Sequence, residues 1–264
     1  MKLAQLSGFV FDLDGCVWTG AVLRPGAKEF VETLRLRGKR LLFLSNNSRE
    51  LPVSVAARLT GLGIEVSPAE VLTALELLGR EIAQRFGRTT VLAVGAGEMM
   101  RALEAEGHSV VPVERWAEAR VVAVGNDPTF DYAKLKAASL AVARGAGFVT
   151  VNLDPRLPLE EGDFDPGGGA LAEAIAVASG VRPVVVGKPN PSIFRVALER
   201  LGCRPHEAAM IGDSLNTDIR GGLEAGMVTV WLAPPEVEAE FGIHPRLRVA
   251  SFHELLEQLD DDLP

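Results

Sequence analysis

The sequence has little of several features that mark particular classes of protein. It contains two cysteines, Cys16 and Cys203, which lie in different segments without metal-ligand spacing and so do not indicate a disulfide-stabilised scaffold. Its four histidines are scattered and form no ligand pair, which argues against a zinc site. We expect both cysteines to be packing residues.

Long apolar runs and basic blocks are also missing. No stretch approaches the length needed to span a bilayer, and the first residues lack the apolar core of a signal peptide. Lys and Arg number 27 against 35 Asp and Glu, which gives a formal net charge of -8 at pH 7. We therefore expect a cytoplasmic protein whose partners include neither nucleic acid nor membranes.

What is present is a regular alternation of apolar runs and amphipathic stretches. With 264 residues and 47% hydrophobic content, the chain can bury one large core or two smaller ones. The alternation predicts the α/β fold class with parallel sheets. The predicted strands are 9–11, 41–44, 91–94, 121–124, 148–151, 184–186, 208–211 and 228–231, and the predicted helices are 25–34, 53–59, 74–86, 99–106, 132–144 and 193–201. Gly167-Gly168-Gly169 predicts a hinge or tight turn before a helix at Leu171.

Two acids follow the first of these strands. Phe9-Val10-Phe11 is an apolar run, and it leads directly into Asp12 and Asp14. Alternation along a strand predicts that the two carboxylates lie on the same side, a few ångströms apart. Carboxylates held so close repel each other unless a cation, a proton or a phosphoryl group lies between them. In open α/β sheets, the carboxyl edge of the strands is where ligands bind.

Three other predicted strands also end in polar residues. The second is followed by Ser45-Asn46-Asn47-Ser48, whose hydroxyl and backbone N–H groups can bind an anion. The strand at 184–186 leads to Lys188, and the strand at 208–211 leads through Gly212 to Asp213 and then Asp218. Parallel strands of one sheet place such ends on one edge, so we expect these side chains to converge.

The order and spacing of these segments resemble the haloacid dehalogenase superfamily of phosphohydrolases over nearly the whole chain. Asp12 and Asp14 match the first motif, Ser45 the second, Lys188 the third, and Asp213 with Asp218 the fourth. The long insertion between Ser45 and Lys188 looks like the α/β cap, of type C2, found in the NagD-like and 4-nitrophenylphosphatase-like branch. The resemblance implies a Rossmann-like core over residues 1–74 and 183–264 and a smaller α/β cap domain over 75–182. Cys16 departs from many relatives, which carry Thr or Val there.

The resemblance also implies a mechanism. Asp12 would attack phosphorus to form an aspartyl-phosphate, and Asp14 would act as general acid and then as general base. Mg²⁺ would be held by Asp12, the backbone carbonyl of Asp14 and Asp213, while Asp218 would orient Lys188 or a metal-bound water. The expected metal environment is thus Asp12, Asp14, Asp213 and Asp218, the catalytic residues are Asp12, Asp14, Ser45 and Lys188, and the residues around the phosphoryl group are Ser45, Asn46, Asn47 and Lys188.

Substrate choice would be made in the cap. Four polar residues follow predicted strands there and are candidates for substrate contact: Asn126, Asp127, Asn152 and Asp154. By resemblance, cap loops of this branch exclude bulky substrates, which favours a small phosphorylated metabolite as the partner. Sugar phosphates, phosphoglycolate-like acids, nucleoside monophosphates and pyridoxal phosphate all fit, and the branch allows a homodimer formed through the cap.

Two alternative functions stay open. A phosphotransferase would share the aspartyl-phosphate intermediate, and a phosphate-binding or sensing protein would share the site without turnover. A response-regulator receiver is excluded, because receivers are about half this length and lack a long insertion between the hydroxyl and the lysine. A haloacid dehalogenase is disfavoured, because it has no use for Asp14 as a leaving-group acid or for a Mg²⁺ site.

Overall fold

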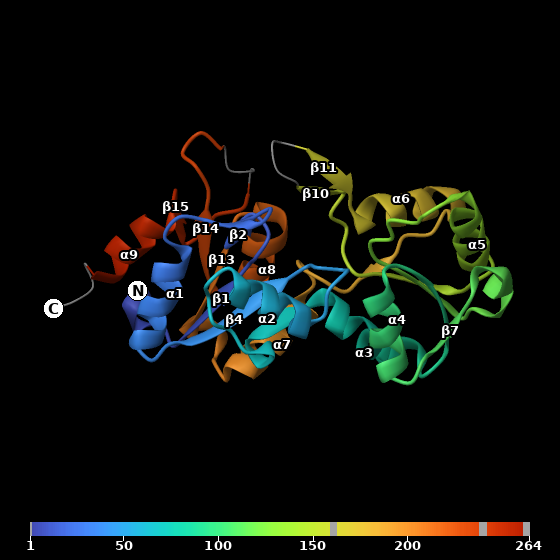
Figure 1. Ribbon diagram of the computed structural model, residues 1–264, viewed down its shortest axis with the longest axis horizontal. Helices are drawn as coiled ribbons and strands as arrows, with labels where there is room; N and C mark the ends of the chain where they lie inside the picture. The colour runs from blue at the N-terminus through green and yellow to red at the C-terminus, as the bar shows by residue number, and fades with distance from the viewer. Residues whose placement is uncertain (1, 159–162, 238–241, 261–264) are drawn as a thin grey trace. The chain divides into compact units, whose positions relative to one another are not determined.

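The computed structural model describes residues 2–158, 163–237 and 242–260, and they form two compact units (Figure 1). The first unit comprises Met1–Ser45, Val53–Leu72 and Lys188–Pro264, and the second comprises Asn46–Pro52 and Thr73–Gly187. The second unit thus includes the short segment directly after Ser45 and extends to Gly187, whereas the insertion was expected over 75–182. Within the described ranges, no helix is both long and apolar enough to cross a bilayer.

The first unit is built on a six-stranded sheet in the order β15-β14-β13-β1-β4-β5. Its strands are β1 (Gly8–Phe11), β4 (Arg40–Ser45), β5 (Val71–Thr73), β13 (Ala208–Gly212), β14 (Val228–Leu232) and β15 (Leu247–Val249). β1 pairs in parallel with both β4 and β13. The chain therefore leaves β1 toward one side of the sheet and later fills the other side, so the carboxyl end of β1 lies at a topological switch point, where ligands bind in such folds.

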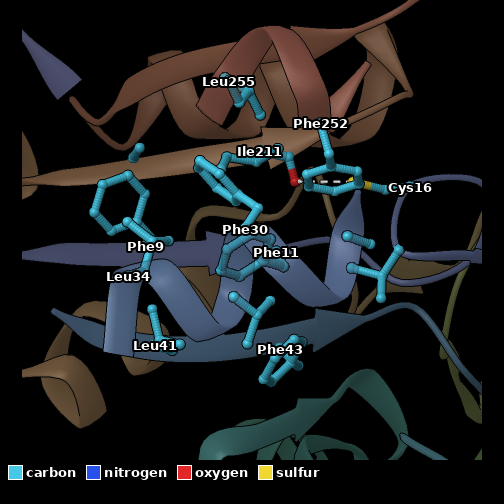
Figure 2. Close-up of a cluster of buried hydrophobic side chains, with 14 of the residues drawn as sticks. Phe9, Phe11, Cys16, Phe30, Leu34, Leu41, Phe43, Ile211, Phe252 and Leu255 are labelled. Carbon is cyan, nitrogen blue, oxygen red and sulfur yellow. Dashed lines mark hydrogen bonds between the residues drawn. The ribbon is translucent and has the colours of Figure 1, made fainter. Parts of the chain in front are cut away.

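Helices and aromatic side chains cover this sheet. The helices are α1 (Ala27–Leu36), α2 (Pro52–Gly61), α7 (Pro191–Leu201), α8 (Arg220–Glu224) and α9 (Phe252–Asp260), and a short hairpin is formed by β2 (Trp18–Thr19) and β3 (Val22–Leu23). Figure 2 shows Phe11, Phe30 and Phe252 in the core, where the ring centroids of Phe11 and Phe30 are 6.0 Å apart. All four residues of β1 are buried, as expected of a central parallel strand.

Both cysteines are buried and unpaired, which confirms that they are packing residues. The Sγ atom of Cys16 donates a weak hydrogen bond to the carbonyl of Ile211, 3.7 Å away (Figure 2). Burial raises the pKa of the Cys16 thiol well above its usual range. The thiol is therefore protonated and inert, although it lies close to the acidic motifs.

The second unit contains a five-stranded parallel sheet in the order β12-β9-β8-β6-β7. Its strands are β6 (Thr90–Val94), β7 (Ser109–Val111), β8 (Val121–Val124), β9 (Gly147–Thr150) and β12 (Val184–Val185), and its helices are α3 (Ala74–Phe86), α4 (Gly97–Ala105), α5 (Tyr132–Ala143) and α6 (Gly168–Ser179). α5 and α6 lie side by side (Figure 1). A hairpin, β10 (Arg156–Pro158) and β11 (Phe164–Pro166), precedes α6. Two parallel sheets confirm the predicted α/β class.

Two local predictions were wrong. Val184–Val185 does not join the sheet that contains β1, because it pairs with β9 and the N–H of Gly187 continues this pairing to the carbonyl of Val151 at 2.8 Å. The glycines at 167–169 are not a hinge before a helix, because α6 already begins at Gly168. A Cβ atom on Gly169 would collide with the backbone of Leu153, so the glycines allow the helix to start against another backbone segment.

Candidate active site

The carboxylate of Asp12 and the ammonium group of Lys188 form a buried ion pair just beyond β1. Asp12 follows the last residue of the strand, and its N–H still donates to the carbonyl of Ile211 on β13 at 2.9 Å. Lys188 Nζ donates to Asp12 Oδ1, to Asp218 Oδ1 at 2.7 Å and to the carbonyl of Leu44 at 3.3 Å. Three acceptors hold the three donors of an ammonium group, so the position of Lys188 is fixed.

Three carboxylates lie together around this lysine. Asp12, Asp213 and Asp218 each offer an oxygen atom, and these oxygens lie within 4.8 Å of one another. Three carboxylates and one ammonium group leave two negative charges, which is the charge that a divalent cation neutralises. Oxygen donors are the ligands that Mg²⁺, Ca²⁺ and Mn²⁺ prefer. The cluster therefore fits a hard divalent metal ion.

The electrostatics of the cluster follow from burial and from this excess of negative charge. Burial raises the pKa of Asp12 well above its usual range, and the ion pair with Lys188 offsets this only in part. Burial, together with repulsion from Asp218, raises the pKa of Asp213 to about 6. Burial alone would lower the pKa of Lys188, but the carboxylates of Asp12 and Asp218 raise it instead, so Lys188 stays charged at neutral pH.

Two glycines make room for this arrangement. A Cβ atom on Gly15, whose φ is 92°, would collide with the carboxylate of Asp213. A Cβ atom on Gly212 would collide with the carboxylate of Asp218. Asp218 lies in a single π-helical turn, Leu215–Ile219, and its Oδ2 accepts the N–H of Ser214 at 3.1 Å. With its other oxygen on Lys188, Asp218 is placed to orient that lysine.

Asp14 lies apart from the three clustered carboxylates. β1 ends at Phe11, and a turn follows in which the N–H groups of Cys16 and Val17 donate to the carbonyl of Leu13, so the alternation expected of a strand does not extend to Asp14. The exposed Asp14 carboxylate accepts a hydrogen bond from Trp18 Nε1 at 2.8 Å and one from the hydroxyl of Ser45 at 3.4 Å.

Trp18 and Trp231 were not predicted to take part in the site. Trp18 orients the side chain of Asp14, and Trp231 Nε1 donates to the backbone carbonyl of Asp213 at 2.8 Å. A tryptophan four residues after an aspartate in a turn gives a weak signal, because it equally predicts a packing residue. The contact depends on the hairpin of β2 and β3, which brings the indole back to the turn.

The six polar candidates of the second unit fall into two groups. Asn47 and Asp127 are engaged in their own loops: Asn47 Oδ1 accepts the N–H of Glu50 at 2.9 Å, and Asp127 Oδ2 accepts from Lys134 Nζ at 2.7 Å. Of the other four, Asn46, Asn152 and Asp154 are hydrogen-bonded to one another. Asn126 instead bonds to Ser48 and to Arg49, and Arg49, which was not predicted, also pairs with Asp165.

Comparison with known proteins identifies the family of this chain. The model of the haloacid dehalogenase-like hydrolase family matches residues 9–109, and a HAD-hydrolase-like model matches residues 185–245. An acid sugar phosphatase from Staphylococcus aureus is 34% identical over 228 residues, which is 86% of each chain.

Solved structures match over almost the full length. A 4-nitrophenylphosphatase from Thermotoga maritima has a TM-score of 0.87 at 30% identity, covering 97% of this chain and 98% of its own. NagD from Escherichia coli K-12 has a TM-score of 0.83 at 27% identity, covering 95% of this chain and 98% of its own. The chain therefore belongs to the haloacid dehalogenase-like hydrolase family, in its NagD-like phosphatase branch.

Proposed function

We propose that this chain is a magnesium-dependent phosphatase that hydrolyses small phosphomonoesters through an aspartyl-phosphate. The proposal is carried by the cluster beyond β1, in which Lys188 and three carboxylates leave two negative charges. Phosphoryl transfer needs an in-line nucleophile and positive charge around the transferring oxygens. The names of the acid sugar phosphatase and the 4-nitrophenylphosphatase support the same reaction class.

Asp12 is the proposed nucleophile. Its Oδ1 is held by Lys188, which leaves the other carboxylate oxygen to attack phosphorus. A bond forms between that oxygen and phosphorus while the bond from phosphorus to the ester oxygen breaks. The hydroxyl of Ser45 and the N–H of Asn46 donate to the phosphoryl oxygens, and Lys188 balances the charge of Asp12 and of the transferring group.

Asp14 is the proposed general acid and base. It donates a proton to the leaving oxygen, and it then removes a proton from the water that attacks the aspartyl-phosphate. The bond between phosphorus and Asp12 breaks in this second step, and inorganic phosphate leaves. The hydrogen bond from Trp18 to Oδ1 of Asp14 supports this assignment, because it orients the carboxyl group so that Oδ2 faces the hydroxyl of Ser45, which is proposed to bind the phosphoryl group.

The cation would be held by the carboxylates of Asp12 and Asp213 and by the backbone carbonyl of Asp14. It would supply the positive charge that lowers repulsion between these carboxylates and the phosphoryl oxygens. Asp218 would orient Lys188 rather than bind the ion, since both of its oxygens already accept hydrogen bonds.

We assign the first unit as the hydrolase core and the second as the cap domain. All residues proposed to act on phosphorus, except Asn46, belong to the first unit, and the second is formed by Asn46–Pro52 and Thr73–Gly187. A small phosphorylated metabolite, such as a sugar phosphate, phosphoglycolate or a nucleoside monophosphate, is the proposed substrate.

The test is phosphate release from 4-nitrophenyl phosphate with and without Mg²⁺, followed by a panel of small phosphomonoesters. We expect Mg²⁺-dependent release by the native chain and none by Asp12→Asn. Asp131→Asn is the matched control, because Asp131 caps α5 in the second unit and its variant should retain activity. No release from any ester by the folded native chain with Mg²⁺ would overturn the proposal in favour of a phosphotransferase or a phosphate-binding protein.

A further inference from the structure

We infer that Asn152 and Asn126 are positioning residues that hold the phosphate-binding segment after Ser45, rather than ligands of the substrate's leaving group. This inference rests on the proposed function, because it assumes that Ser45 and the N–H of Asn46 bind the phosphoryl group. The chain passes from the first unit to the second between these two residues. The segment Asn46–Pro52 is therefore anchored by the second unit while Ser45 ends β4 in the first.

Asn152 fixes the peptide on one side of Asn46. It follows β9, its side chain is buried, and its Nδ2 donates to the carbonyl of Asn46 at 2.7 Å. Its Oδ1 accepts the N–H of Asp154 at 3.2 Å. Because a carbonyl only accepts and an N–H only donates, these partners fix the orientation of the amide. Both polar atoms of Asn152 thus have partners within the protein.

Asn126 fixes the same segment two residues further along. It follows β8, which pairs with β9, so the two asparagines lie at neighbouring strand ends. The N–H of Asn126 donates to the hydroxyl of Ser48 at 3.1 Å, and its Oδ1 accepts from Arg49 Nε at 2.5 Å. Its Nδ2 donates to the carbonyl of Pro166 at 2.7 Å. Asn126 is also buried, and its N–H and its Oδ1 both bind the segment.

Gly187 completes the support of Asn46. A Cβ atom at this position would collide with Asn46 Oδ1 and lie 2.8 Å from the carbonyl of Val151. Gly187 directly precedes Lys188, so the Asn46 side chain packs against the residue that leads into the catalytic lysine. Asn46 Nδ2 also donates to Asp154 Oδ2 at 3.3 Å. The second unit therefore holds Asn46 at its carbonyl and at Nδ2, and the missing Cβ of Gly187 leaves the space that Oδ1 occupies.

This arrangement makes a specific kinetic prediction. A residue that positions the phosphate-binding segment acts on the part that every phosphomonoester shares, so its loss should affect all esters equally. A ligand of the leaving group would instead affect only esters whose leaving group reaches it. The two roles are separated by the affinity for inorganic phosphate, which has no leaving group.

The test uses Asn152→Asp, which keeps the shape of the side chain but places an acceptor opposite the carbonyl of Asn46. Phosphate binding is measured by calorimetry with Mg²⁺, and kcat/KM is measured for 4-nitrophenyl phosphate and for several small alkyl phosphates. We expect phosphate affinity and every kcat/KM to fall by about tenfold or more, by a common factor. Asn152→Ala is the fallback if the first variant does not fold, with the same expected result.

Asp131→Ala is the stability control, because it removes the cap of α5 in the same unit, where Asp131 Oδ1 accepts the N–H of Lys134. Unchanged phosphate affinity in Asn152→Asp, with losses confined to some esters, would overturn the inference in favour of a leaving-group ligand. If Asn152→Asp lowers the melting temperature but leaves the kinetics unchanged, as expected of the control, Asn152 has only a structural role and the inference is wrong. Phosphate binding needs no turnover, so the positioning role is tested even if the native chain releases no phosphate. A native chain that binds no phosphate would overturn the inference as well.

Discussion

Replacing Lys188 by methionine removes the cation from the buried cluster and should strongly destabilise the protein. The Lys188 side chain is 2% exposed, and those of Asp12 and Asp218 are 8% and 1% exposed. Methionine has a similar length and an apolar end, so the change in packing is small and the change in charge dominates. The carboxylates of the cluster would then face one another without a cation from the protein.

Removing one partner of a buried ion pair costs about 3 to 5 kcal/mol, because the remaining charge stays desolvated and uncompensated. For a domain of this size, that loss corresponds to a fall in melting temperature of about 6 to 20 °C. The assay is thermal and urea unfolding of the metal-free protein at neutral pH. Lys134→Met is the matched control, since Lys134 pairs with Asp127 but is 23% exposed, and we expect it to cost about 1 kcal/mol or less.

The deficit of Lys188→Met should depend on pH. Burial already raises the pKa of Asp12, and loss of the opposing lysine raises it further. When a carboxyl group has a higher pKa in the folded state than in the unfolded state, a falling pH protonates the folded state first. Lowering the pH therefore stabilises the folded state. The variant should therefore recover stability relative to the native protein between neutral pH and about pH 4. Native Lys188 keeps its proton over this range, so its own titration contributes nothing.

Added Mg²⁺ provides a second readout of the same variant. The cluster without Lys188 carries one more negative charge, so Mg²⁺ should raise its melting temperature by more than it raises that of the native protein. A loss below about 1 kcal/mol, or a deficit that is independent of pH, would refute the view that Lys188 neutralises these carboxylates.

Three further predictions concern the surroundings of the cluster. Gly187→Ala should destabilise the protein by about 1 to 3 kcal/mol in urea unfolding, because its Cβ would displace Asn46. An unchanged free energy of unfolding would contradict this, since it would mean that the structure accommodates the Cβ without strain. Trp18→Phe removes the hydrogen bond to Asp14 and should lower kcat more for alkyl phosphates than for 4-nitrophenyl phosphate, whose leaving group needs little protonation. Equal losses of kcat for both kinds of ester would argue against a role of Trp18 in orienting the general acid. Burial and the nearby Asp218 raise the pKa of Asp213 to about 6 in the metal-free protein, so a proton competes with the metal ion below that pH. The affinity for divalent metal, measured by calorimetry, should therefore fall by about tenfold per pH unit below about pH 6. An affinity that is constant from about pH 5 to 7 would contradict this prediction.

The sequence by itself determined most secondary structure and the residues of the cluster. The apolar spacing from Ala74 to Phe86 predicted α3 with the bounds that the structure shows. The polar residues after β1, β4 and β13 were found because each follows a fully apolar run. Such patterns are local, since burial on both faces of a strand leaves a continuous apolar signal in the chain. The short strands β5 and β7 have three residues each and give no comparable signal, whereas β12 was predicted as a strand but assigned to the wrong sheet.

Only the tertiary structure decided which segments share a sheet and which carboxylates meet. β12 pairs with β9 rather than with a strand of the first sheet, because strand pairing depends on partners distant in sequence. Asp14 is separated from Asp12 because the backbone turns after Phe11, whereas Asp218 joins the cluster from a helical turn. Asn126 and Asn152 bond to the segment after Ser45, because the second unit folds around that segment. Residue type and order set the chemistry available to this chain, but the direction of each side chain depends on contacts between segments that lie far apart in the sequence.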